Sequence, residues 1–234
     1  MAGGEAIRLQ RAEKRTDSFS FGDHPEWARL ARAVRRQVEA CVELDSEGAD
    51  IGALADQAER LAETLASHAK GKRVGLVENA WRDHEGGASL DYLPFSPIMG
   101  RLNPASYGLS ITQEGDRAVG RVVLNETAEG AVGLAHGGVI SGLWDEVLAA
   151  ANAVRQTGGP TASLTIRYRK PTPLHEPLVY TAWVERIDAR KVLVRGECTV
   201  EGAPDVVLTE AEGLFIQIQQ ASIDWHGDRE REKA

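Results

Sequence analysis

Apolar residues recur at helical spacing in two stretches near the start of the chain. The first stretch covers residues 27–42, with arginines and glutamates between the apolar positions, and the second covers residues 51–65. Pro25 suits the first turn of one helix, and Asp50 is a candidate cap for the other. The linker ELDSEGA predicts an αα-hairpin, so we assign residues 1–75 to an N-terminal helical extension.

Residues 76–104 show no clear period, and their glycines and prolines predict an ordered but irregular connection. From residue 105 the pattern becomes typical of short strands, many of them alternating between apolar and polar positions. The predicted strands cover residues 107–112, 117–124, 161–168, 178–187, 191–200 and 206–218. Short turns between the last three make them antiparallel neighbours. Residues 105–219 therefore predict a sheet domain, and residues 220–234 a charged tail.

One long apolar segment interrupts the strands. Residues 133–150 read GLAHGGVISGLWDEVLAA, which is too long and too rich in alanine for a strand. We predict a helix from Gly138 to about Arg155. Because this helix is almost wholly apolar, a curved antiparallel sheet is expected to wrap around it and bury it. The expected fold class is α+β.

Composition narrows the classes of function. The chain has 234 residues and a formal net charge of −8, which argues against broad binding to nucleic-acid phosphates. Cys41 and Cys198 lie far apart and suit a reducing compartment, so we expect a cytoplasmic protein. No apolar run is long enough to span a membrane, and no signal-type core begins the chain. The histidines form no zinc pattern, so neither a metal nor a cofactor is expected.

The apolar helix contains two adjacent carboxylates. Between Gly133 and Val154, Asp145 and Glu146 are the only charged residues, and His136 is the only other ionisable one. A buried and unpaired carboxylate is strongly destabilising, so such a group should be paired, protonated or facing a cavity. A site is one interpretation. A carboxylate that emerges at an edge and pairs with an arginine is the other.

His136, Gly137 and Gly138 lie where the loop meets the helix. Glycines let the backbone approach a ligand closely, and the free N–H groups of a helix start suit a carbonyl oxygen or an oxyanion. A plain tight turn is the alternative. Gly138 and Asp145 are about 10 Å apart along one helix face, too far for both to reach one reacting centre. Two antiparallel copies of the helix close that gap, so we predict a homodimer with shared active sites.

The motifs AHGGVISGLWDE, GGPTASLTIRYRKPTP and AEGLFIQI together resemble the hotdog-fold acyl-CoA thioesterases of the PaaI-like group. They are especially similar to the branch that contains thioesterase superfamily member 4. The resemblance covers about residues 90–219. It implies a hotdog fold, in which a curved antiparallel sheet wraps around a long central helix, and hydrolysis of acyl-CoA to the free acid and CoA.

The resemblance also implies roles for individual residues. The family's aspartate, a general base or nucleophile, falls on Asp145, and the amide that polarises the thioester carbonyl falls on Gly137 or Gly138, with His136 beside them. Thr161 stands where relatives use a Ser or Thr to position water or the carboxylate. Many relatives carry an Asn or Gln where this chain has Gly130. Glu146 is a further catalytic candidate, although it points about 100° away from Asp145.

An acidic protein that binds the phosphates of CoA needs a local cationic rim. The resemblance assigns that role to Arg167, Arg169 and the pair Arg190 and Lys191, and Lys170 extends the first concentration. A solvated sheet face is the alternative interpretation of these residues. The acyl pocket is expected between the central helices of a dimer and the irregular 90–104 segment. The candidates for its lining are Phe95, Ile98, Met99, Leu143, Trp144 and Val147.

Other functions stay open at this point. A non-catalytic acyl-CoA-binding module, a thioesterase for acyl-carrier-protein thioesters and a hotdog hydratase or dehydratase are the alternatives. Association of dimers into tetramers also stays open, and the sequence does not choose an acyl group. The retained Asp145 favours hydrolysis.

Overall fold

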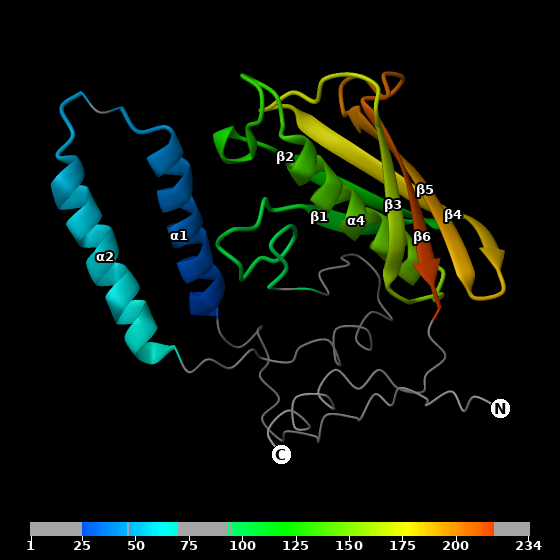
Figure 1. Ribbon diagram of the computed structural model, residues 1–234, viewed down its shortest axis with the longest axis horizontal. Helices are drawn as coiled ribbons and strands as arrows, with labels where there is room; N and C mark the ends of the chain where they lie inside the picture. The colour runs from blue at the N-terminus through cyan, green and yellow to red at the C-terminus, as the bar shows by residue number, and fades with distance from the viewer. Residues whose placement is uncertain (1–24, 46, 70–92, 94, 218–234) are drawn as a thin grey trace, which may run out of the picture.

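A six-stranded antiparallel sheet, one central helix and two N-terminal helices form the structure (Figure 1). The computed structural model describes residues 25–45, 47–69, 93 and 95–217. The predicted charged tail, most of the 76–104 connection and the first 24 residues lie outside the described residues.

The sheet has the strand order β1-β2-β4-β5-β6-β3, so β1 and β3 are its two edges. All neighbours are antiparallel. This confirms the pairing of β4 with β5 and of β5 with β6 that the short turns predicted. The strands are β1 (Ser110–Glu114), β2 (Arg117–Val123), β3 (Thr161–Tyr168), β4 (Pro177–Asp188), β5 (Lys191–Val200) and β6 (Thr209–Ile216). Strand β6 begins later than predicted because the chain still turns at Val206, whose N–H bonds the carbonyl of Ala203. A 3₁₀ turn, η2 (Glu126–Ala128), was not predicted.

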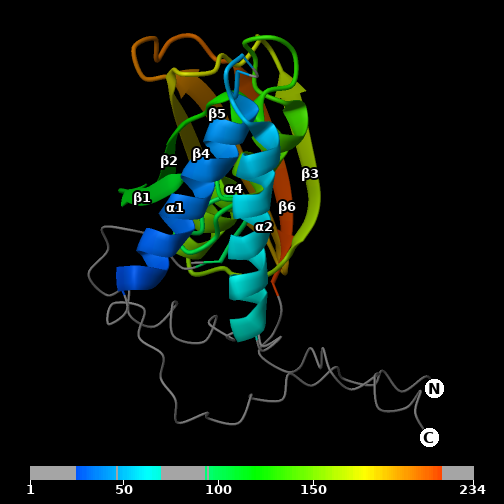
Figure 2. The same cartoon turned by 90° about the vertical axis from the view of Figure 1, so that its left-hand side faces the viewer.

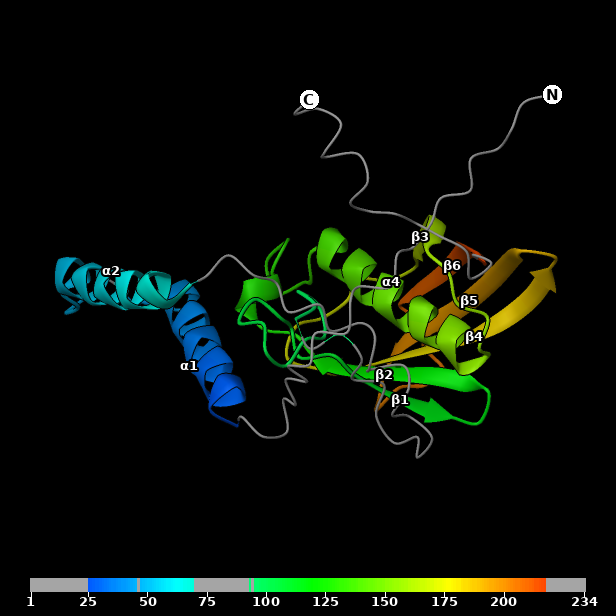
Figure 3. The same cartoon turned by 90° about the horizontal axis from the view of Figure 1, so that it is seen from below.

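The central helix α4 (Gly137–Val154) lies on the inner face of the sheet, which curves around it (Figure 3). Leu143, Trp144, Val147 and Leu148 are fully buried between helix and sheet. The Trp144 indole N–H donates to the hydroxyl of Thr209 on β6 at 2.9 Å, so even the polar edge of this ring is satisfied in the core. The predicted hotdog fold and α+β class are confirmed.

One expectation about α4 is wrong. The helix is buried on the side that faces the sheet but not all round, because a stripe on its other side remains accessible in the single chain. This exposed stripe repeats every three or four residues, and most of its members are small. Its residues are Gly138, Ser141, Gly142, Asp145 and Ala149.

The two N-terminal helices are α1 (Pro25–Val42) and α2 (Ile51–His68), close to the predicted positions. The Asp50 carboxylate caps α2 by accepting from the Ala53 N–H at 3.0 Å. Helix α1 lies next to η2, and its Arg35 donates to the carbonyl of Asn103 at 2.8 Å. Helix α2 lies on the far side of α1 from the sheet and has no buried residue (Figures 1 and 2).

Candidate active site

The turn of His136, Gly137 and Gly138 forms the start of α4. His136 is the cap residue, and its Nδ1 accepts a hydrogen bond from the Gly138 N–H at 2.9 Å. The Gly138 N–H is therefore engaged within the turn. For the Gly137 N–H the described residues provide no partner, as expected for the first residue of a helix. The structure thus distinguishes two amides that the sequence left equivalent.

A hollow of about 500 Å³ opens beside this turn. Gly137, Ile140 and Tyr168 form one part of its lining, and Arg169 and Lys170 lie along it as well. An unpaired amide at a helix N-terminus, with Lys170 along the same hollow, suits an electron-rich oxygen of a ligand. The hollow therefore places an oxygen-binding group where a molecule of some size can reach it.

Gly130 has no room for a side chain in this loop. A Cβ placed on it would lie 2.8 Å from the Cα of His136 and 3.1 Å from the His136 Cβ. The chain is held there because the His136 N–H bonds the carbonyl of Ala128 at 2.7 Å. An Asn or Gln, which the family resemblance implies at this position, would collide with backbone here.

Asp145 lies on the exposed stripe of α4, eight residues after the free amide of Gly137. The hydroxyl of Thr161, the first residue of β3, donates to its Oδ1 at 2.8 Å. The structure therefore joins Thr161 and Asp145, two residues that the sequence analysis placed in one site. The arginine partner of the alternative interpretation is not found among the described residues.

Glu146 has a different environment from its neighbour. Its Oε1 accepts a hydrogen bond from the hydroxyl of Ser96 at 2.5 Å. Burial raises the pKa of Glu146 above its ordinary value, and the nearby charge of Asp145 raises it further, while the Ser96 bond acts in the opposite direction. Since Ser96 belongs to the irregular connection, Glu146 fastens that segment to α4.

The two halves of the candidate site are separated within one chain. Strand β3 runs beside α4 in the opposite direction, with Thr161 near Asp145 and Tyr168 near Gly137. The carboxylate and the free amide therefore lie at opposite ends of the same strand. This agrees with the separation expected from the helix alone.

Comparisons with known proteins decide the family. The family model described as Thioesterase superfamily matches residues 132–205, which include Asp145 and Thr161. A thioesterase superfamily protein of known crystal structure is 31% identical, and the match covers 81% of this chain and 90% of that one with a TM-score of 0.70. The chain belongs to the thioesterase superfamily. The predicted resemblance is confirmed.

Two further relatives are acyl-coenzyme A thioesterases by name. The acyl-coenzyme A thioesterase THEM4 of Mus musculus is 35% identical over 91 residues, and that of Xenopus laevis is 36% identical over 91 residues. Each match covers 38% of this chain, but only 38% of the mouse protein and 40% of the frog protein. This chain therefore matches less than half of the length of these relatives.

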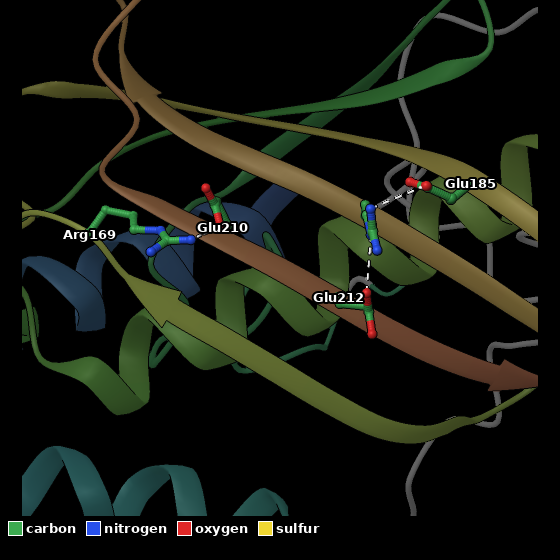
Figure 4. A network of polar contacts seen from close by, with 5 residues as sticks. Arg169, Glu185, Glu210 and Glu212 are labelled. Atoms are coloured by element: carbon green, nitrogen blue, oxygen red, sulfur yellow. Dashed lines mark hydrogen bonds and ion pairs between the residues drawn. The ribbon is translucent and has the colours of Figure 1, made fainter.

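The basic residues expected in this thioesterase-superfamily chain fall into two groups. Arg169 pairs with Glu210 of β6 at 2.8 Å (Figure 4). Arg167 alternates with Tyr168 along β3, so it points to the outer face of the sheet, away from α4. That hydrogen bond raises the pKa of Arg169 and lowers the pKa of Glu210. Lys170 lies beside the hollow at Gly137. The outer face thus has, in part, the character of a solvated ion-paired surface.

Arg190 and Lys191 lie at the other end of the sheet. They line a second hollow of about 340 Å³ together with Asp188. Lys191 is opposite Ile216, while Arg167 is opposite Glu210, so the two basic groups are separated by most of the length of β6. That separation is about 20 Å at 3.3 Å per residue. One chain does not bring the predicted carrier-binding residues together.

The expected acyl-pocket residues also divide. Leu143, Trp144 and Val147 are 0% exposed and belong to the core between α4 and the sheet. They pack against strands, as expected if they belong to the plain core, which was the alternative to a role in lining the pocket. Phe95 and Ile98 remain partly accessible on the connection. Ile98 covers Gly142 closely, since a Cβ there would be 2.6 Å from the Ile98 Cδ1.

The sequence analysis assigned no site role to Tyr168, Ser141 or Ser96. Tyr168 was detectable in principle, because it alternates with Leu164 and Ile166 and so points to the same side of β3. Ser96 bonds a residue 50 positions away, a pairing for which the sequence contains no signal.

Proposed function

We propose that this chain is an acyl-CoA thioesterase that hydrolyses acyl-CoA to the free acid and CoA. The observation that carries the proposal is the Asp145 carboxylate, held by Thr161 on the exposed side of α4, in a chain whose helix start offers a free amide beside a hollow. The activity for which the THEM4 relatives are named supports the choice of substrate class.

In the proposed reaction, the Gly137 N–H donates to the thioester oxygen and stabilises the charge that develops there. Asp145 removes a proton from water, which adds to the carbonyl carbon, or attacks that carbon itself to form an anhydride that water then opens. The carbon–sulfur bond breaks, and CoA leaves as a thiolate. A free thiol has a pKa of about 8.5, so the thiolate can leave without protonation by a strong acid. Glu146, bonded to Ser96, takes no direct part in this proposal.

We further propose a homodimer in which each site uses both chains. Strand β3 is an edge of the sheet with one side unpaired by any described strand, and the exposed stripe of α4 lies beside it. An uncovered edge is a template for pairing with another strand. A two-fold axis across β3 would place Asp145 of one copy next to Gly137 of the other.

The same symmetry supports the proposed carrier site. It would bring Arg190 and Lys191 of one copy toward the hollow where the other copy has Arg169 and Lys170. The two groups that are separated in one chain would then form one cationic rim for phosphates. No helix of the described residues is long and apolar enough to cross a membrane. A cytoplasmic location stays a prediction, which cell fractionation tests.

The catalytic assignment is tested by Asp145→Asn, with Asp116→Asn in the exposed β1–β2 turn as the matched control. Thiol release from a panel of short, long and aromatic acyl-CoAs should fall by about a hundredfold or more in the first variant only. Full activity of Asp145→Asn would refute the proposal. Tight binding without hydrolysis by the native protein would favour the binding module, and activity on acyl-carrier-protein thioesters alone would change the substrate.

The shared site is tested by mixing two inactive variants. Gly137→Pro removes the free N–H at a helix position that tolerates proline, and the extended backbone of His136 is compatible with a following proline. Mixed dimers of this variant with Asp145→Asn would contain one intact site each, so random exchange should restore about a quarter of the native activity. Mixtures that stay inactive after subunit exchange would show that the site is not shared.

A further inference from the structure

Tyr168 contacts the glycine turn from the end of β3. Its hydroxyl donates to the carbonyl oxygen of Gly137 at 2.9 Å. The Ser141 hydroxyl donates to the same oxygen at 2.9 Å, and the two hydroxyl oxygens are 3.1 Å apart. The tyrosine ring also lies against Gly137, since a Cβ placed there would be 3.4 Å from the hydroxyl. Two side chains from different elements therefore converge on one carbonyl.

That carbonyl belongs to the peptide between Gly137 and Gly138. The N–H of the same peptide donates to His136 Nδ1 at 2.9 Å. Tyr168 and Ser141 hold one edge of this peptide plane, and His136 holds the other. A pair of glycines is otherwise the most flexible backbone available. The Gly137 N–H belongs to the neighbouring peptide, whose His136 carbonyl accepts from the N–H groups of Val139 and Ile140 at 3.0 and 3.1 Å. Both peptide planes that meet at the Gly137 Cα are therefore held, and with them the direction of the Gly137 N–H.

The exposure of Tyr168 separates this role from core packing. Its side chain is 52% exposed and forms part of the wall of the 500 Å³ hollow. A buried tyrosine such as Tyr180 stabilises the fold through its area, whereas Tyr168 offers less area and a hydroxyl bound to the turn. Gly130, on the same loop, provides no side chain to support the turn. Tyr168 therefore orders the glycine turn from β3, an element outside both the loop and α4.

We propose that Tyr168, together with Ser141, is a positioning residue that aims the Gly137 N–H at the thioester oxygen. The inference rests on the proposed function, because it assigns the amide to a carbonyl of the substrate. A donor whose direction is set before the substrate arrives stabilises the developing charge without reorganisation. A small misplacement of such a donor lowers the rate strongly while leaving binding of the rest of the substrate intact.

The test uses Tyr168→Phe, which keeps the ring and removes the hydroxyl, with Tyr107→Phe as the matched control. Tyr107 lies before β1 and lines a different hollow, next to α1. We expect kcat of Tyr168→Phe to fall by about five- to tenfold with KM nearly unchanged, the size of one lost hydrogen bond. Ser141→Ala should lower kcat less, and the double variant should lower it by less than the product of the two effects.

A second measurement distinguishes positioning from a purely structural role. A ketone analogue of acyl-CoA, in which CH₂ replaces the thioester sulfur, reports carbonyl polarisation through its infrared stretching frequency. In the native protein the bound carbonyl should shift to lower frequency, and the shift should be smaller in Tyr168→Phe. Unchanged kcat, or a lowered kcat with an unchanged carbonyl frequency, would overturn the inference. If the native protein binds the analogue but hydrolyses no acyl-CoA, the proposed function fails, and the frequency comparison still tests Tyr168.

Discussion

Removal of the Thr161 hydroxyl tests how Asp145 is held. Thr161→Val keeps the shape and the β-branch of the side chain but removes the donor that lies 2.8 Å from Asp145 Oδ1. The carboxylate then loses its side-chain anchor on β3 and can rotate about its own bonds. Thr161→Ser is the matched control, because it restores a hydroxyl at the same position.

The size of the effect follows from the charge on the acceptor. A hydrogen bond to a charged group contributes about 1.5–3 kcal/mol, and each 1.4 kcal/mol is a factor of ten in rate. Both side chains are exposed in the single chain, which favours the lower end of this range. We therefore expect kcat of Thr161→Val to fall about tenfold if water still reaches the pair. A loss nearer a hundredfold is expected if a second chain covers it.

The assay is steady-state thiol release with the best substrate of the acyl-CoA panel. KM should change little, because Thr161 contacts the carboxylate rather than the substrate in this proposal. Circular dichroism and gel filtration should match the native protein, since the hydroxyl bonds only an exposed partner. If Thr161→Val retains native kcat, or if Thr161→Ser is as impaired as Thr161→Val, the hydrogen bond does not position the carboxylate.

Two further predictions concern titrating groups. Burial raises the pKa of Glu146 in the folded chain above its ordinary value of 4.5. The contribution of this group to the free energy of unfolding is therefore fully present below pH 4.5, and it is lost as pH rises through the pKa of the folded chain. Glu146→Gln should therefore unfold at higher urea concentration than the native protein at about pH 8, with the difference vanishing in acid; a less stable variant at that pH would contradict this. Burial raises the pKa of the Cys198 thiol to about 12, whereas Cys41 is exposed. A disulfide dye should count one thiol in the native chain and both after unfolding, and a native count of two would contradict the burial.

Most of the fold follows from local patterns. Strands β3 and β5 begin and end at the predicted residues, because alternation and turn residues delimit them. Helix α4 begins one residue before its predicted start, at Gly137, since glycines mark its N-terminus. The 3₁₀ turn η2 has only three residues, too few to produce a period.

The exposure of α4 could not be predicted from its composition. Gly142 and Ala149 are apolar in sequence, yet both lie on the accessible stripe beside Asp145. A helix that packs against a second chain has the same sequence pattern of small and apolar residues as a helix buried in the core of its own chain. For α2 the reverse holds, because its apolar stripe predicted a packed face and the single chain buries none of it.

The residues of the candidate site were named from the sequence, but their arrangement was not. Asp145, Thr161 and the glycine turn were all identified from motifs, and the choice between the Gly137 and Gly138 amides needed the His136 ring in place. The pairing of Arg169 with Glu210 joins positions 41 residues apart through strand register. Local patterns do not specify such register-dependent pairs.

The contact between Gly130 and His136 makes this glycine difficult to replace. Because the His136 Cα occupies the space of a side chain, an amide residue introduced there by one substitution would displace the loop that begins α4. A side chain at this position would require compensating changes in the loop first. The loop and its glycine thus form one unit of design, and engineering that aims to place an amide side chain there must rebuild the loop rather than exchange a single residue.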